Sequence, residues 1–301
     1  MRELNIYGGN AWEIDFGRPG PIVAVVGGIH GDEKTGVQVV RRMVAMGEQH
    51  LLDIRAGRLW LIEANPEAIA IAVRAIKREG RLWDLNRMCI ESILSSNARV
   101  PEIMRVKALI KLLIRADIVL DLHATTLETA EPFMMLQPRP DRRALELISC
   151  FNVSKIVYDP HFIFGCGEPV SLDEYISRMG KVGMCYETGW AQDTSRVSQV
   201  LDEVLDLLRF LGMLRQHTSL PIIRPQQTLY ELERAVILGE SGFRWYNGTG
   251  YHNLQTFGSG ETIGWHGDDP VVVSTDSMTV FPKAPDRWEV GKPVCYLAKK
   301  L

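Results

Sequence analysis

The stretch PIVAVVGGIHGDEKTGVQ, residues 21–38, decides how the fold is read from the sequence. Its first half is a continuous apolar run that ends in glycines, which is typical of a strand buried on both faces of a sheet. Its second half predicts a helix, because apolar residues recur at helical spacing at Val37, Val40 and Val44. His30 and Glu33 stand between the two halves. A structural turn needs the glycines but neither of these side chains, so both are candidate functional residues.

The same alternation of strand and helix continues along the chain. Apolar, β-rich runs predict further strands over residues 58–65, 117–126 and 182–190. Apolar residues at helical spacing predict helices over residues 101–116 and 198–215. Strands that alternate with helices indicate an α/β fold with a mixed, mostly parallel sheet flanked by helices. Such sheets bind ligands at the carboxyl ends of their strands.

The character of the sequence changes near residue 220. Residues 221–301 contain short β-type segments and turn signals such as YNGTGY and GSGE, with no convincing amphipathic helix. We therefore predict two domains: an α/β domain over residues 1–220, which carries the candidate functional residues, and a smaller all-β domain over residues 221–301, which could cover them.

Composition excludes several classes of function. The chain has 301 residues with a net charge of −3 and a pI near 6.2, so there is no electrostatic reason to expect nucleic acid as a main partner. Its apolar runs are too short to span a bilayer, and the amino terminus has no apolar signal segment. Five cysteines without a CxxC pair favour reduced thiols and predict a cytoplasmic protein.

Three residues form a candidate metal site. His30 and Glu33 follow one predicted strand, and His123 closes another, so all three belong at the same edge of the sheet. Two histidines and one glutamate are a known ligand set for catalytic zinc, with a fourth position open for water. Gly31 would give the loop the backbone freedom to turn between the first two ligands. Alternatively, His123 is a core histidine and Asp121 ties down a turn, but the combination favours one Zn²⁺ per chain.

Glu187, in MCYETGW, closes a third predicted strand. Burial in this apolar segment should raise the pKa of its carboxyl group. A glutamate beside a zinc-bound water can take the proton of that water and pass it to a leaving amine. The structural alternative is a glutamate paired with an arginine; next to a metal site, the catalytic role is favoured.

The segment KREGRLWDLNR, residues 77–87, supplies candidate substrate-binding groups. Asn86 and Arg87 place an amide beside a guanidinium group, and this pair suits recognition of a carboxylate. Arg78 or Arg81 could polarise a scissile carbonyl group. Without a metal site nearby, the same residues would form an ordinary solvated turn.

With these residues assembled, the sequence resembles the succinylglutamate desuccinylase/aspartoacylase family, relatives of the zinc carboxypeptidases. The resemblance covers residues 20–215 and is carried by GGIHGDEKTG, NPEAIA, DLNR, DLHATT and YETG in the family's order. It implies zinc held by His30, Glu33 and His123, with Glu187 as general base and acid. It also implies a homodimer.

The resemblance extends to the substrate-binding groups. It implies that Asn86 and Arg87 bind the substrate carboxylate, and that an arginine before DLNR polarises the acyl carbonyl. We assign the latter role to Arg81, with Arg78 as the alternative. Arg178 lies near the position where aspartoacylases have an arginine for a second carboxylate. Such sites are often completed by a tyrosine of the second domain, for which Tyr246 and Tyr251 are candidates.

The all-β domain resembles barrel-sandwich folds of the biotinyl and lipoyl carrier type, through EVGKPVCYL near its end. No lysine stands in the usual Met-Lys-Met hairpin, so a role as a lid or in substrate screening is expected in place of covalent carriage.

Taken together, the sequence predicts a zinc-dependent hydrolase that cleaves the linear amide bond of a small N-acyl amino acid. The same zinc and carboxylate would also serve a metallocarboxypeptidase that acts on peptides. A third hypothesis is a binding protein that keeps the fold without turnover.

Overall fold

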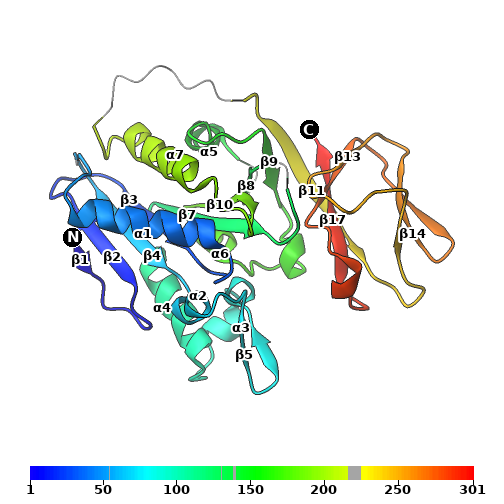
Figure 1. Cartoon of the computed structure of the whole chain (residues 1–301), viewed down its shortest axis with the longest axis horizontal. Coiled ribbons are helices and arrows are strands. Elements are labelled where there is room, and N and C mark those ends of the chain that lie inside the picture. Colours follow the sequence, from blue (N-terminus) through cyan, green and yellow to red (C-terminus); the bar gives the residue numbers. More distant parts are fainter. Residues whose placement is uncertain (54, 130, 138–139, 216–224) are drawn as a thin grey trace.

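A single mixed sheet runs through most of the molecule (Figure 1). The structure is a computed structural model that describes residues 1–53, 55–129, 131–137, 140–215 and 225–301. Within these residues the sheet has twelve strands in the order β1-β2-β4-β3-β7-β10-β8-β9-β11-β17-β16-β13. Its first eight strands along the chain are β1 (Arg2–Glu3), β2 (Ala11–Asp15), β3 (Ile22–Gly27), β4 (Arg58–Glu63), β7 (Ile118–Thr125), β8 (Phe133–Leu136), β9 (Lys155–Tyr158) and β10 (Val182–Trp190).

The centre of the sheet is parallel, as predicted. Strand β3 pairs in parallel with β4 and β7, and β7 pairs in parallel with β10. Alternate residues of β3 pack into two different hydrophobic clusters, with Val23 and Val25 on one face and Ala24 and Val26 on the other. This explains why the strand is a continuous apolar run, because both of its faces are buried.

Helices cover both faces of the sheet (Figure 1). Helices α1 (Lys34–Glu48), α5 (Arg142–Ile148) and α7 (Val197–Phe210) pack on one face, and α4 (Pro101–Leu113) and α6 (Leu172–Arg178) pack on the other. The shorter helices are α2 (Pro66–Ala70), α3 (Glu91–Leu94) and the 3₁₀ turns η1 (Leu85–Arg87), η2 (Ile163–Gly165) and η3 (Pro285–Arg287). The helix predicted over residues 198–215 ends earlier than expected, because Gly212 takes a positive φ of 70° just after its last turn. None of the described helices is long and apolar enough to cross a membrane.

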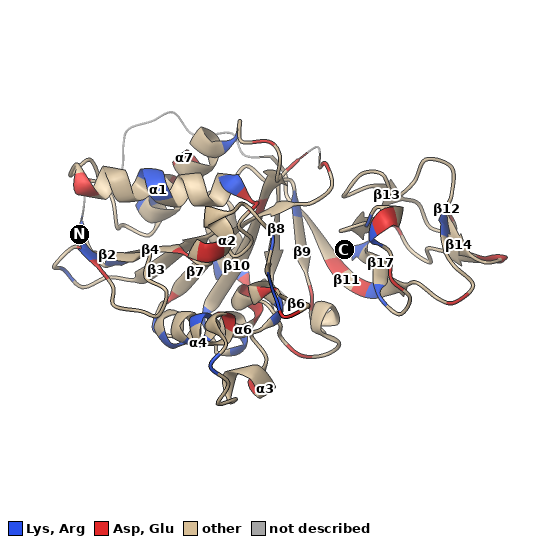
Figure 2. Ribbon diagram, turned by 60° about the horizontal axis from the view of Figure 1, so that its bottom comes forward, with Lys and Arg blue, Asp and Glu red and all other residues tan. Residues whose placement is uncertain are grey.

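The C-terminal part is all-β, as predicted (Figure 2). Strands β11 (Thr228–Ile237), β17 (Pro293–Lys300), β16 (Ser277–Val280) and β13 (Thr256–Phe257) continue the large sheet, and β12 (Arg244–Trp245), β14 (Thr262–His266) and β15 (Asp269–Val272) form a second, three-stranded sheet. The described strands form open sheets and no closed barrel.

The two predicted domains share backbone hydrogen bonds. Strand β11 pairs in parallel with β9, with Thr228 opposite Lys155 and Glu231 opposite Tyr158. The large sheet therefore passes from the α/β part into the all-β part. The domain boundary predicted at residue 220 lies outside the described residues.

Candidate active site

The candidate site lies at the carboxyl ends of three neighbouring parallel strands. His30 and Glu33 lie in the loop between β3 and α1, His123 lies on β7, and Glu187 lies on β10. In the register of β7 and β10, His123 stands directly opposite Glu187. The sheet thus brings together four side chains from three distant segments of the chain, at the edge where open α/β sheets bind ligands.

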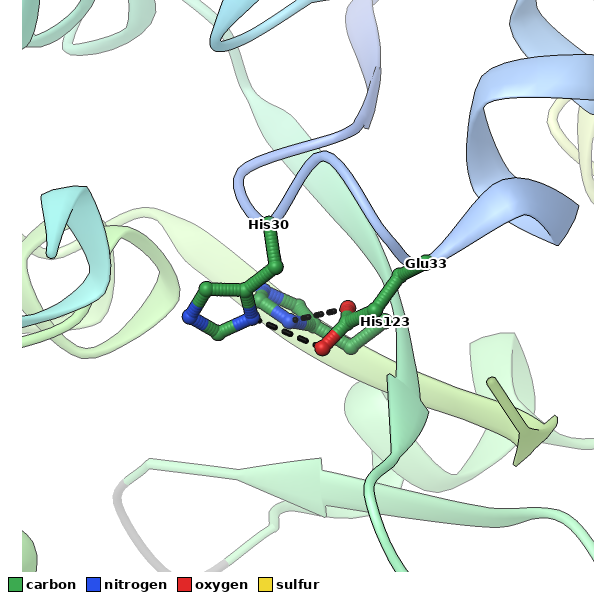
Figure 3. Close-up of side chains that lie close together, drawn as sticks. All are labelled: His30, Glu33 and His123. Atoms are coloured by element: carbon green, nitrogen blue, oxygen red, sulfur yellow. Dashed lines mark hydrogen bonds and ion pairs between the residues drawn. The ribbon is translucent and has the colours of Figure 1, made fainter. Parts of the chain in front are cut away.

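His30, Glu33 and His123 form a buried cluster (Figure 3). One oxygen of Glu33 lies 2.7 Å from Nδ1 of His30, and the other lies 3.1 Å from Nδ1 of His123. One ligand atom from each residue lies within 4.8 Å of the other two. Two imidazole nitrogens and a carboxylate at this spacing fit a zinc ion with an open fourth position.

The loop between the first two ligands is held by close packing. Gly31 has no positive φ, so the conformational freedom expected for it is not used. A Cβ atom at this position would lie 2.1 Å from the carbonyl oxygen of Ala68 in α2. Glycine is needed at this position because the loop backbone packs directly against α2. This contact positions the loop that carries His30 and Glu33.

In each histidine, Nδ1 faces Glu33, and the other ring nitrogen, Nε2, faces a second carboxylate. Nε2 of His30 lies 3.1 Å from Oδ1 of Asp84, and Nε2 of His123 lies 3.1 Å from Oδ2 of Asp121. In metal sites such carboxylates fix the orientation of the imidazole ring and increase its basicity. Asp121 therefore has a more specific place than the structural turn considered from the sequence. Asp84 opens the DLNR motif, where sequence reasoning gave it no role.

Burial and the surrounding carboxylates have opposite effects on the pKa values of the cluster. Burial alone would lower the pKa of His30 and His123, but Glu33 with Asp84 or Asp121 raises both, and that of His123 strongly. Burial would raise the pKa of Glu33, yet the two histidines hold it well below its usual value. The carboxylates thus create a site that favours positive charge, whether protons or a metal ion that replaces them.

Glu187 is buried next to the cluster and forms no ion pair with an arginine among the described residues. Its side chain is 6% exposed, and its Oε2 atom has no hydrogen-bond partner among the described residues. Burial, with the charge of Glu33, raises the pKa of Glu187 to about 7, although His123 opposes the shift. A carboxyl group with this pKa can both accept and release a proton near neutral pH.

Arg74 is a site residue that sequence reasoning missed. Its guanidinium group donates to Oε1 of Glu33 at 2.9 Å and to Oγ1 of Thr126 at 3.4 Å, and the residue lines the cavity above the cluster. In the sequence it is separated from DLNR by the hairpin of β5 (Ile76–Arg78) and β6 (Arg81–Trp83). The hairpin carries two other arginines, Arg78 and Arg81, that are nearer to the motif in the sequence. The role of polarising the carbonyl group was therefore assigned to one of these two.

Neither of the two hairpin arginines lines the cavity. Arg78 binds Glu102 at 2.8 Å and also pairs with Glu67. Arg81 stacks on the ring of Trp83, 4.1 Å from its centroid. Both side chains are thus engaged within or beside their own hairpin, away from the His30–Glu33–His123 cluster.

A cavity of about 750 Å³ opens over the site and is walled by both parts of the chain. Asn86 and Arg87, in η1, line it close to Asp84, whose side chain accepts from the backbone N–H of Asn86 at 2.9 Å. The C-terminal part contributes Lys283, Arg287, Lys292 and Tyr296. Tyr296 is thus a tyrosine of the C-terminal part that lines the cavity.

Three other predicted residues lie outside this cavity. Arg178 is exposed at the end of α6. Tyr246 and Tyr251 are exposed in the C-terminal part, and the tyrosine that lines the cavity is Tyr296 on β17. Tyr296 could not be recognised from a periodic pattern, because the orientation of its side chain depends on how β17 pairs with β11 and β16.

A family model and several solved structures match the fold of this chain. The family model described as "Succinylglutamate desuccinylase/Aspartoacylase catalytic domain" matches residues 19–210. The solved succinylglutamate desuccinylase from Vibrio cholerae has 18% sequence identity and a TM-score of 0.76, over 99% of this chain and 90% of that chain. The enzyme of the same name from Chromobacterium violaceum has 17% identity and a TM-score of 0.75, over 100% and 93% of the two chains.

Murine aminoacylase 3 has 23% identity and a TM-score of 0.69, over 94% of this chain and 96% of that chain. At these identities the likeness to solved structures shows a shared fold. A search of curated protein sequences found no match. The family model covers well over half of the chain, including the three cluster residues and Glu187. The chain belongs to the succinylglutamate desuccinylase/aspartoacylase family.

Proposed function

We propose that this protein is a zinc-dependent hydrolase that cleaves the amide bond of a small N-acyl amino acid into a carboxylic acid and an amine. One observation carries the proposal: the buried His30–Glu33–His123 cluster lies beside Glu187, a carboxyl group that forms no ion pair with an arginine among the described residues. Membership of a family named for deacylases supports the same reaction.

The cluster suits one zinc ion. Zinc bound there would act as a Lewis acid and would lower the pKa of its bound water molecule toward 7. Glu187 would take a proton from that water and pass it to the leaving nitrogen as the carbon–nitrogen bond breaks. The oxygen of the water joins the carbonyl carbon, so the products are a carboxylic acid and an amine.

The arginines of the cavity have separate tasks in this proposal. Arg87 with Asn86 would hold the carboxylate of the amino acid, because a guanidinium group can bind both of its oxygens. Arg74, whose guanidinium group already contacts Glu33, would donate to the scissile carbonyl oxygen as charge develops on it. This role was expected of Arg81 or Arg78, and the geometry favours Arg74.

The shape of the cavity favours a small substrate over a peptide. Lys283, Arg287 and Tyr296 of the C-terminal part wall the site, and the volume of about 750 Å³ is within the range of small-molecule pockets. The cavity walls from the C-terminal part would therefore exclude a long peptide chain. The five free cysteines support a reducing compartment such as the cytoplasm.

Metal analysis combined with a substrate screen tests the proposal. Protein purified without chelator should contain about one zinc per chain, and it should release amines from N-acetyl or N-succinyl amino acids but not from tetrapeptides. Cleavage of the peptides alone would favour a metallocarboxypeptidase. A metal-free protein that cleaves neither class would favour the binding-protein hypothesis.

A further inference from the structure

The cavity continues past Glu187 along strand β10. Every second residue of a strand points to the same face, so Gly183, Cys185 and Glu187 share one face of β10. Cys185 and Glu187 line the cavity. At Gly183 the first turn of α6 lies against the strand, since a Cβ there would meet the carbonyl oxygen of Asp173 at 2.2 Å. Asp173, which also lines the cavity, thus stands at its end, beyond Cys185.

Asp173 is a buried carboxyl group that forms no ion pair with the residues that the structure describes. It is 5% exposed, and Oδ1 accepts from the hydroxyl group of Ser171 at 2.6 Å. No lysine, arginine or histidine forms an ion pair with it in the described part of the chain. Burial and the charges of Glu174 and Asp121 raise its pKa to about 7, although its hydrogen bond to Ser171 and the charge of His123 act in the opposite direction.

Gln137 provides a second, independent observation at the same place. It is 7% exposed and lines the cavity, and its Oε1 atom has no hydrogen-bond partner among the residues that the structure describes. Strand β8 pairs antiparallel with β10, with Met135 opposite Cys185. If the same register continues for two more residues, Gln137 lies opposite Gly183. Asp173 of α6 packs against the same glycine.

We propose that Asp173 and Gln137 form a pocket for a substrate side chain that ends in a protonated amine, so that the preferred substrates are N-acyl diamino acids. This inference rests on the proposed function and specifies its substrate class. An ammonium group has three donors and no acceptor, and it would meet the carboxyl group of Asp173, which forms no ion pair in the described residues, and the amide oxygen of Gln137, which has no hydrogen-bond partner there. A buried carboxylate is stabilised by such a partner, whereas a second substrate carboxylate would be repelled.

The inference differs from the role that the resemblance implied for Arg178. Arg178 was assigned to a second substrate carboxylate, but it is exposed at the far end of the helix that carries Asp173. The cations that line the cavity are Arg74, Arg87 and the C-terminal Lys283, Arg287 and Lys292. A zwitterionic substrate would place its carboxylate toward these groups and its amine toward Asp173.

Length-matched substrates test the pocket. Values of kcat/KM would be measured for N-acetyl-ornithine against N-acetyl-norleucine, and for N-acetyl-2,4-diaminobutyrate against N-acetyl-norvaline, because each pair differs only in an ammonium group or a methyl group. The wild-type protein should prefer the cationic member of at least one pair by tenfold or more. N-acetyl-glutamate should be the poorest substrate.

Two pocket variants and one control variant accompany the substrates. Asp173→Asn should lower the cationic-to-neutral ratio at least tenfold, and Gln137→Met should lower it at least threefold. Asp202→Asn, an equal charge change on the exposed side of α7, should leave the ratio unchanged. A wild-type ratio near one, a preference for N-acetyl-glutamate, or an unchanged ratio in Asp173→Asn would each overturn the proposal. So would a loss of ratio in the control variant.

Calorimetry separates this proposal from the proposed function. If no N-acyl amino acid is cleaved, the proposed function fails, and the pocket is judged by binding alone. L-ornithine should then bind the zinc-loaded protein at least tenfold more tightly than L-norleucine, and Gln137→Met or Asp173→Asn should reduce that difference. Equal binding of the two amino acids would overturn the pocket.

Discussion

At the scale of single residues, Glu187 has an environment unlike that of an ordinary surface glutamate. It is buried beside a cluster that can hold a metal, and it forms no ion pair with an arginine in the described residues, although the charge of Arg74 acts on it. We expect Glu187→Gln to keep its zinc and to lose more than about a hundredfold in kcat, because the amide cannot move a proton. Steady-state kinetics and metal analysis of the same preparation check this. A loss below tenfold would remove Glu187 from the role.

Arg74 and Arg81 offer a direct choice between two assignments. Arg74 contacts Glu33 inside the cavity, whereas Arg81 stacks on Trp83 outside it. We expect Arg74→Ala to lower kcat/KM by about a hundredfold or more, as the loss of one oxyanion donor does. Arg81→Ala should change it less than threefold. If the two variants rank in the opposite order, the assignment made from the sequence is the right one.

Asp173 should also leave a signature in the pH dependence of stability. Its pKa rises from 3.8 to about 7 on folding, so the native state holds a proton that the unfolded chain releases between these values. The free energy of unfolding should therefore fall as pH rises from 5 to 7, by about 2 kcal/mol for this group.

Asp173→Asn removes this titration. Relative to the wild-type protein it should gain stability between pH 5 and 7, in a denaturant titration repeated at each pH. Parallel stability curves for the two proteins would show that Asp173 ionises in the native state as it does in the unfolded chain.

Local motifs identified the residues of the His30–Glu33–His123 cluster but not every residue around them. His30, Glu33 and His123 stand at strand ends, and strand ends can be read from apolar runs. Arg74 was missed because a hairpin separates it from the motif that it serves. Asp173 was missed because its exposure to the cavity depends on how α6 packs over Gly183, and no single segment of sequence records that contact.

At the scale of elements, the loop from β3 to α1 depends on its contact with α2. A methyl group at Gly31 would overlap the backbone of Ala68, so either the loop or α2 must move. We expect Gly31→Ala to weaken zinc binding at least tenfold and to destabilise the fold by about 1–3 kcal/mol, the usual cost of overpacking. Competition with a chelator and thermal unfolding measure the two effects.

Gly80→Ala is a matched control for the metal. This glycine lies in the β5–β6 turn with open space around it and a positive φ, so its substitution costs backbone strain without touching the loop. It should leave zinc affinity unchanged. If both variants lose zinc equally, the contact with α2 does not position the ligands.

The elements that the sequence predicted well are those buried on two faces. Strands β3, β7 and β10 follow mostly apolar runs. The start of α4 was also predicted, because proline, which has no backbone N–H, is favoured in the first turn of a helix, where that group would have no partner within the helix. The short strands β8 and β9 were not predicted, because they have four residues each and too little periodicity to separate a strand from a buried loop.

At the scale of the whole molecule, the sheet joins the parts that the sequence separated. Strand β11 pairs with β9 along its first residues, and Tyr158 donates a hydrogen bond to Glu231 across this junction. Both parts also wall the same cavity. We therefore expect the chain to unfold in one cooperative transition, with coincident midpoints by tryptophan fluorescence and far-ultraviolet circular dichroism.

The junction itself can be weakened to test this coupling. Tyr158→Phe removes a hydrogen bond to a carboxylate, which is worth about 1.5–3 kcal/mol, and it should lower both midpoints together by about 2–5 °C. Tyr7→Phe, an equal change at an exposed position near the amino terminus, should shift neither. Two separate transitions, or a shift in only one probe, would mean that the α/β and all-β parts fold independently. The C-terminal wall of the cavity would then be held by weaker contacts than the continuous sheet implies.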